Sequence, residues 1–257
     1  MEYIIVILFS FLGSLLTFYS GFGLGTILLP VFTILVSVEV AIIMTAIVHF
    51  LNNFFKLFLT YGNIDFNILK SFGLISLFTS ILGAIVFAYF YNSGWSLNYS
   101  LLDYPMKITM LKLIIGSLLI VFVLLEFSNR LKTIQLNKNQ ILWGGILSGF
   151  FGGLSGHQGA LRSAFLSKAG LNKHQFIATG IACACLVDIG RLWIYGKTNF
   201  SELAHSNLGL IGVALISAFS GAWLGNKYIQ KISSSQLQTL ICICLIGFAV
   251  LMIVGFI

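Results

Sequence analysis

The chain of 257 residues repeats itself faintly, in one register that runs without a gap. The stretch 21–66 reappears as 155–200, at an offset of 134 residues. The matched positions cover a glycine-rich turn, a long apolar segment and its Tyr-Gly end: Gly25 and Gly159, Ile43 and Ile177, Thr45 and Thr179, Ile47 and Ile181, Tyr61 and Tyr195, Gly62 and Gly196, and Phe66 and Phe200. A repeat in an apolar chain predicts a transporter of two related halves, with its site between them.

Charged residues make up only 8% of the chain, and hydrophobic residues 58%. Because soluble domains carry about 25% charged residues, the sequence predicts a polytopic membrane protein. The net charge of +7 comes from basic residues in short loops. This is the positive-inside pattern, and it argues against nucleic acid as a partner. The acidic Glu2 is untypical of a signal peptide, so we expect the first apolar segment to be a retained membrane helix.

Ten apolar segments are expected to form helices: 3–19, 21–36, 39–61, 67–91, 107–127, 140–153, 156–168, 174–196, 205–226 and 235–257. The first two, the sixth and the seventh are about 13–17 residues long, short of the roughly 20 that a full span needs. They pair naturally as two re-entrant hairpins, 3–36 and 140–168, with glycine tips near 21–25 and 152–159. The other six segments are long enough to cross.

The expected fold class is therefore an all-α polytopic membrane protein, a single transporter domain 1–257 made of two repeats, about 1–128 and 136–257. Each repeat has five segments, and because five is odd the second repeat enters the membrane in the opposite direction. Inverted repeats bring the two tips to the midplane from opposite faces, which suits alternating access. Basic residues gather near 63, 133, 170 and 230, so these loops are expected to be cytoplasmic and both termini outside. The aromatic loop around 99 then lies at the outer interface.

The first tip reads GFGLGTILLP, from Gly21 to Pro30. Gly23 and Gly25 would let the backbone turn sharply and leave N–H groups uncovered. The helix that starts beside Thr26 would direct its positive end at the midplane, where an anion can bind. The alternative is that these glycines only allow close helix packing.

The second tip, from Gly152 onward, reads GGLSGHQGALRSAF and adds polar side chains to the same glycine pattern. An arginine inside an apolar helix costs at least about 2.5–3.5 kcal/mol on insertion scales and usually lines a polar cavity. Arg162, His157 and Gln158 are therefore expected to bind an oxyanion such as a carboxylate, a sulfonate or sulfite, while Gly159 shapes the turn. Alternatively, Arg162 extends to a membrane interface.

Two of the long segments carry further polar residues. Asp188 and Arg191 lie three residues apart on one helix face. They form a structural ion pair, or Asp188 carries a coupling proton and Arg191 is a second anion contact. In the corresponding first-half helix, one polar stripe that could serve the transport pathway comprises His49, Asn52, Asn53 and Lys56. His49 shuttles a proton near neutral pH or makes an ordinary interhelical hydrogen bond, and Lys56 lines the pathway or extends to the cytoplasmic interface.

The sequence contains no combination of residues typical of an enzyme. It has no HExxH, no GxSxG, no paired carboxylates and no P-loop. The four cysteines stand in pairs at i,i+2, on different faces of a helix, which favours neither a metal site nor redox chemistry. We therefore expect no catalytic residues, no metal and no cofactor. The cysteines are Cys183, Cys185, Cys242 and Cys244.

These motifs resemble those of the TauE/SafE sulfite exporter family, also called the 4-toluene sulfonate uptake permease family. The resemblance spans nearly the whole chain and rests on G-F-G-x-G…P after the first helix, on the second glycine-rich turn and on the two-repeat layout. It implies secondary transport of sulfur-containing anions, such as sulfite or organosulfonates, across the bacterial inner membrane. The second turn here, Gly156-His157-Gln158-Gly159, differs from the glycine-only turn of many members. The first motif comprises Gly21, Phe22, Gly23, Gly25 and Pro30.

The sequence thus predicts a secondary transporter of small anions with a midplane site between the two tips. Two other functions stay open. The same hairpins could build an anion channel, or the protein could be a non-transporting membrane partner that docks another protein. The expected partners are a small, sulfur-containing anion and the lipid bilayer, and a homo-oligomer is compatible with the sequence.

Overall fold

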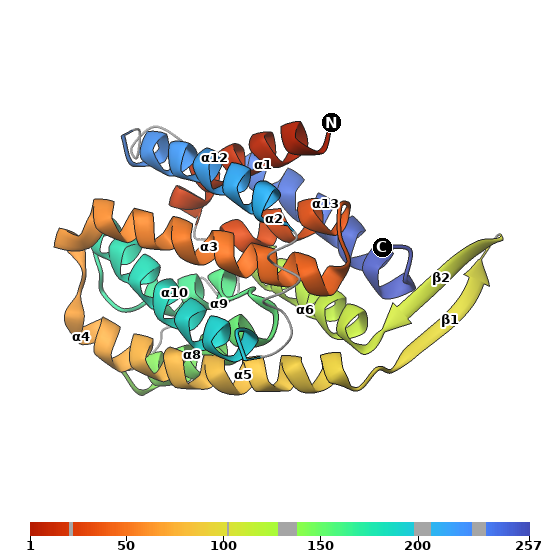
Figure 1. Cartoon of the computed structure of the whole chain (residues 1–257). Coiled ribbons are helices and arrows are strands. Elements are labelled where there is room, and N and C mark those ends of the chain that lie inside the picture. The colour runs from red at the N-terminus through yellow and green to blue at the C-terminus, as the bar shows by residue number, and fades with distance from the viewer. Residues whose placement is uncertain (21–22, 102, 128–137, 198–206, 228–234) are drawn as a thin grey trace.

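The computed structural model describes the whole chain except residues 21–22, 102, 128–137, 198–206 and 228–234. It is a bundle of helices with one β-hairpin that projects from it (Figure 1). The helices of the first half are α1 (Glu2–Ser20), α2 (Leu24–Thr33), α3 (Val38–Thr60), the short η1 (Tyr61–Asn63), α4 (Phe66–Ile68) and η2 (Leu69–Gly73), α5 (Leu74–Asn92) and α6 (Met110–Phe127). Those of the second half are α8 (Lys138–Ser155), α9 (Gly159–Leu166), α10 (Lys173–Tyr195), α12 (Leu208–Lys227) and α13 (Ser235–Val254).

Each of the ten apolar segments contains one long or tip-forming helix, so the positions of the helices are confirmed. Within the described ranges, four helical stretches are long and apolar enough to cross a membrane: Val38–Asn63, Phe66–Asn92, Lys173–Tyr195 and Leu208–Lys227. Six crossings were expected from the sequence. In the segments 107–127 and 235–257, which contain α6 and α13, the apolar helical stretches among the described residues are Met110–Leu125 and Ile241–Val254.

The β-hairpin is the main departure from an all-α fold. Strands β1 (Ser96–Leu101) and β2 (Tyr104–Thr109) pair antiparallel, from Ser96 opposite Thr109 to Leu101 opposite Tyr104. We expected only an aromatic loop near 99 and a helix from 107, because the apolar content of this stretch outweighed its period-2 alternation, which is typical of strands. The hydroxyl of Tyr99 donates to the carbonyl of Val254 at 2.6 Å, which anchors the hairpin at the end of α13.

The helix packing has a regular pattern. Helix α3 packs against α10, and α6 against α13. Helix α1 lies along α12 just as α8 lies along α5, while α12 packs on α3 just as α5 packs on α10. The two halves correspond helix by helix: α1 to α8, α2 to α9, α3 to α10, α5 to α12 and α6 to α13. When each helix is replaced by its counterpart, every packing pair named above becomes either another of these pairs or the same pair again.

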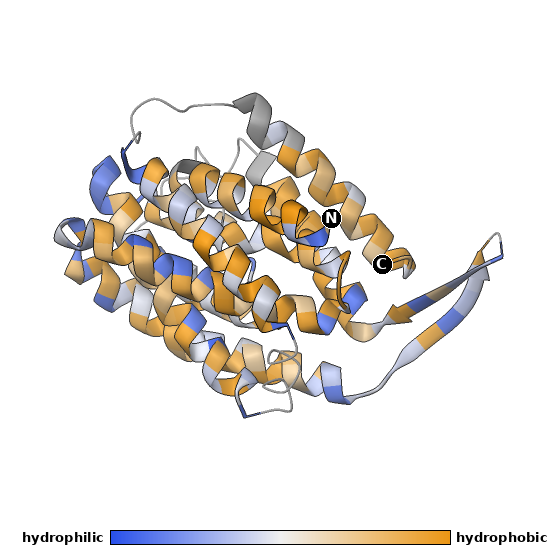
Figure 2. Ribbon diagram, turned by 45° about the horizontal axis from the view of Figure 1, so that its top comes forward, coloured by the Kyte–Doolittle hydropathy of each residue, from blue (hydrophilic) through white to orange (hydrophobic). Residues whose placement is uncertain are grey.

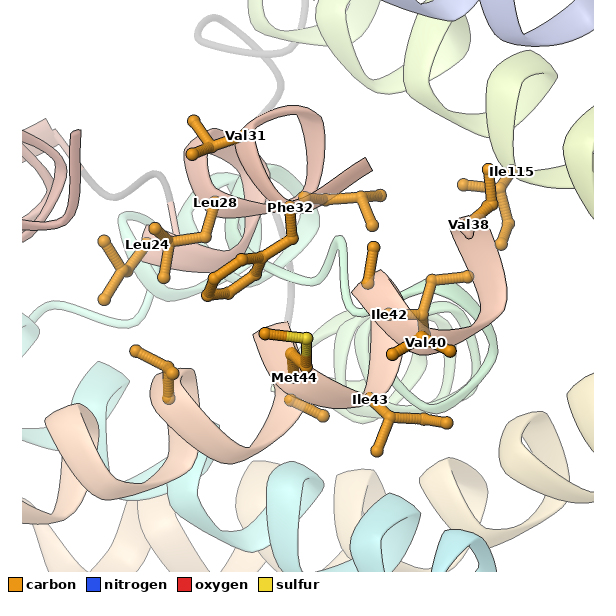
Figure 3. Packing of buried hydrophobic residues seen from close by; sticks show 14 of the residues in the cluster. Leu24, Leu28, Val31, Phe32, Val38, Val40, Ile42, Ile43, Met44 and Ile115 are labelled. Atoms are coloured by element: carbon orange, nitrogen blue, oxygen red, sulfur yellow. The ribbon is translucent and has the colours of Figure 1, made fainter. Parts of the chain in front are cut away.

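The apolar core lies where α2 meets α3. Leu28 and Phe32 of α2 are fully buried, and Met44 of α3 is buried beside them (Figure 3). Apolar side chains also cover the outside, where Phe58 is 82% exposed. Figure 2 shows hydrophobic residues over most of the helical ribbon and hydrophilic residues at the hairpin. An apolar exterior over an apolar core is what a bilayer requires of a helical protein.

Helices α5 and α8 approach so closely that only glycine fits at their contact. A Cβ on Gly153 of α8 would collide with the carbonyl oxygen of Ser80, and one on Gly83 of α5 with the carbonyl oxygen of Phe150. Small residues of this kind let membrane helices pack backbone to backbone.

We expect Gly153→Ala to lower the melting temperature of the detergent-solubilised protein by several degrees, because overpacking costs about 1–3 kcal/mol. The matched control is Gly212→Ala, since a Cβ at Gly212 meets nothing within 4 Å. Size-exclusion chromatography after heating measures both variants. Equal melting temperatures for the two would contradict the close α5–α8 contact.

Candidate functional site

Five histidine, lysine, arginine and aspartate side chains of the helices are buried near one another in the interior of the bundle. None of the five is more than 8% exposed. They come from three helices, and they are His49 and Lys56 of α3, Arg162 of α9, and Asp188 and Arg191 of α10. Since charged residues are almost never fully buried unless they have a partner, this concentration marks the candidate site.

The carboxylate of Asp188 lies at the centre of this group. One oxygen, Oδ2, accepts from Nδ1 of His49 at 2.7 Å and from Nδ2 of Asn53 at 3.3 Å. The other, Oδ1, lies 2.7 Å from Nη2 of Arg191. The sequence left open whether Asp188 and Arg191 touch; they form an ion pair, and Asp188 also ties α10 to α3.

The first tip packs directly on His49. A Cβ on Gly23 would lie 3.0 Å from Nε2 of the imidazole, and one on Gly25 would lie 3.6 Å from its Cδ2 and 3.3 Å from Thr45 Cγ2. The two glycines therefore serve at least the close packing that the sequence offered as one alternative. Because His49 also binds Asp188, the first tip is connected to α10 through one side chain.

The second tip packs on Arg191 in the same way. Gly156 has a φ of +79°, a conformation that favours glycine, and a Cβ there would collide with Nη1 of Arg191. A small pocket is lined by Thr26 of α2 and by His157 and Gly159 of the second tip. Polar groups predicted separately in the two tips are thus brought together at one place.

Several buried polar atoms at the second tip have no hydrogen-bond partner among the described residues. They are both ring nitrogens of His157, both amide atoms of Gln158 and Nη1 of Arg162. These side chains are 4%, 0% and 8% exposed. Leaving a buried polar group without a partner costs about 1–3 kcal/mol, so several of them together indicate a place where a ligand supplies the missing partners.

The remaining predicted residues, Asn52 and Lys56, face α1. The hydroxyl of Ser14 donates to Oδ1 of Asn52 at 3.0 Å. The ammonium of Lys56 donates to the carbonyl of Ser14 and to Oγ1 of Thr17, each at 3.3 Å. Lys56 is only 3% exposed, so the alternative that it extends to the membrane interface is wrong.

The sequence did not indicate the contribution of α1 or the partner of Asn53. Ser10, Ser14 and Thr17 are the buried polar residues of α1, and their spacing of four and then three places them on one helix face. That spacing was the available signal. Asn53 belongs to the polar stripe of α3, but nothing in the sequence gave it a partner in α10.

The described residues hold no group of three histidine, cysteine or acidic side chains that could bind a metal ion. Donors outnumber acceptors instead. Among the described side chains, three buried cations, Lys56, Arg162 and Arg191, stand against one buried carboxylate, Asp188, and only Arg191 pairs with it. A site with excess positive charge and unpaired N–H groups is suited to an anion.

One comparison with known proteins gives a match. The family model described as "Sulfite exporter TauE/SafE" matches residues 6–252, nearly the whole chain. No curated protein and no solved structure matches.

We expect Asp188→Asn to destabilise the protein strongly, by about 3–5 kcal/mol, because it leaves the buried Arg191 guanidinium without its counter-charge. Thermal unfolding in detergent measures the loss. Asp103→Asn is the matched control, since Asp103 has a φ of +64°, which asparagine tolerates equally well. If Asp188→Asn melted like the control, the carboxylate would not be holding α3 and α10 together.

Proposed function

The chain belongs to the TauE/SafE sulfite exporter family, and from that premise we propose that it is a secondary transporter of small, sulfur-containing anions. The family and the apolar helices make the chain a multi-pass membrane transporter and not an enzyme. The proposal adds the site, the mechanism and the class of anion. We propose that the chain functions in the bacterial inner membrane with both termini outside, since basic residues concentrate in the loops expected to be cytoplasmic.

The observation that carries the proposal is the set of unpartnered buried groups at the second tip, His157, Gln158 and Arg162. An oxyanion between the tips would accept hydrogen bonds from the ring of His157, the amide of Gln158 and the guanidinium of Arg162. The first N–H groups of α9 lie beside these side chains, and the positive end of a helix favours an anion. Sulfite and sulfonates present the oxygen geometry that a guanidinium fork binds.

The packing pattern supports inverted repeats, about 1–128 and 136–257. Exchanging the two halves turns each of the main packing pairs into another of them or into itself, as expected for two repeats related by a two-fold axis. Helix α2 packs on α1, and α9 on α8, which suits two hairpins whose tips approach from opposite faces. In this arrangement, alternating access is the movement of one repeat against the other around a fixed site.

The contact between His49 and Asp188 supports proton coupling. The pair lies inside the bundle, 2.7 Å apart, and His49 also contacts the first tip at Gly23. Adding or removing a proton changes the charge of the imidazole and hence its attraction to Asp188, so protonation would alter how the tip is held. A bound anion would favour the protonated imidazole and so couple the two binding events.

The test of function is uptake of ³⁵S-labelled sulfite, and of a small labelled sulfonate, into proteoliposomes. We expect saturable uptake by the native protein and a loss of at least tenfold for Arg162→Ala, because the guanidinium supplies a charge-assisted contact of more than about 1.4 kcal/mol. Lys70→Ala, which removes one cation from an exposed position, is expected to transport normally.

Flux that rises linearly with concentration would support an anion channel instead. No flux of either anion with well-folded protein would contradict the transporter and favour a docking role in the membrane.

We further expect an imposed pH gradient to change the initial rate of sulfite uptake severalfold for the native protein but not for His49→Gln. Glutamine keeps a donor for Asp188 but cannot take up a proton at neutral pH. The same substitution at the exposed His174 is the control and should leave the response intact. A His49→Gln protein that responds like the native one would exclude His49 as the coupling group.

A further inference from the structure

The interior contains a second pocket, which borders α9 farther along the helix than the pocket between the tips. Its lining includes Arg162, Thr17 and Gly180, together with the apolar side chains Phe18 and Phe176. The first pocket contains His157 and Gly159 but not Arg162. Arg162, which the proposed site between the tips also uses, therefore borders a second space that the first pocket does not include.

Gly180 of α10 lies opposite Arg162 at the edge of this space. A Cβ on Gly180 would lie 3.6 Å from Nε of Arg162. The guanidinium is buried, and its Nη1 has no hydrogen-bond partner in the part of the chain that the structure describes. An unpaired, buried N–H group that borders a pocket is a donor to whatever occupies that pocket.

Lys56 supplies a second positive charge at the edge of the same pocket. Its ammonium donates to Thr17 at 3.3 Å and lies 5.4 Å above the ring of Phe18, and both of these residues line the pocket. Lys56 and Arg162 thus both border this one pocket. Across the described ranges, neither of them pairs with a carboxylate: Asp188 pairs with His49 and Arg191.

Two like charges in an apolar interior are costly unless an anion lies between them. The hydrogen bonds of Lys56 go to Ser14 and Thr17, which leaves one of its three N–H groups for a ligand. The pocket thus offers cationic donors in an apolar enclosure, which selects a small anion.

The pocket lies toward the end of the bundle where α3 ends and α10 begins. Lys56 is four residues from the end of α3, and Phe176 is in the first turn of α10. These two helix ends are joined, because the backbone N–H of Asp65 donates to Oγ1 of Thr179 at 2.9 Å. The loops at this end are the ones expected to be cytoplasmic.

We infer that Lys56, Thr17 and Arg162 form a second anion-binding station between the site at the tips and the cytoplasm. This inference rests on the proposed function, because the ligand is the transported anion itself. With both stations present, the protein holds two anions, and Arg162 is shared between the station and the tips. At each of the two places, the bound anion and the cation beside it neutralise each other. The anion therefore crosses the apolar interior without being left there as an isolated charge.

The test is the stoichiometry of ³⁵S-sulfite binding to the purified full-length protein in nanodiscs, measured without oxygen and in gluconate buffer. We expect about two equivalents for the native protein and about one for Lys56→Met, which keeps the length of the side chain but removes its charge. Lys70→Met is the matched control at an exposed position and should bind about two. A native protein that binds one equivalent, or a Lys56→Met variant that still binds two, would overturn the second station.

Gly180→Leu provides an independent variant that alters no charge. Its side chain would fill the pocket beside Arg162, so we expect about one equivalent of sulfite and unchanged binding between the tips. Binding of two equivalents by this variant would also overturn the station. A native protein that binds no sulfite would instead overturn the proposed function, which keeps the two failures distinct.

Discussion

The carboxylate of Asp188 is the interaction on which the interior of this protein depends. It binds His49 on one side and Arg191 on the other, both at 2.7 Å. Each partner in turn supports one glycine tip, His49 beside Gly23 and Arg191 beside Gly156. One buried negative charge therefore connects α3, α10 and both tips. A charge so deeply buried is stable only with such partners, and the partners keep their positions only because the charge is there.

This arrangement gives the proposed transport a physical basis. An oxyanion attracts the same cations that Asp188 holds, so its arrival would redistribute the contacts of Arg191 and, through Asp188, those of His49. The first tip lies against His49 and the second against Arg191, and Asp188 links these two side chains. A change in the contacts of one side chain would therefore alter the packing of both tips. A ligand shifts a conformational equilibrium only if its contacts differ between the two conformations, and a change of this kind would supply that difference.

The sequence predicted the helix positions well, because apolar runs are local signals. It could not decide whether Asp188 meets Arg191, because three residues of spacing permits contact without requiring it. The partners Asn53 and Thr17 were missed since their roles depend on which helices are neighbours. The hairpin at 96–109 was missed for a different reason: its alternation is short and lies between strongly apolar helices.

The central claim is that the unpartnered groups of the second tip surround an anion. The most direct measurement is a crystal structure with selenite, whose selenium scatters anomalously and which has the shape of sulfite. The account predicts an anomalous peak within hydrogen-bonding distance of His157, Gln158 or Arg162, inside the bundle. Anomalous peaks confined to the exterior of a well-ordered protein, with these side chains still unpartnered, would contradict it.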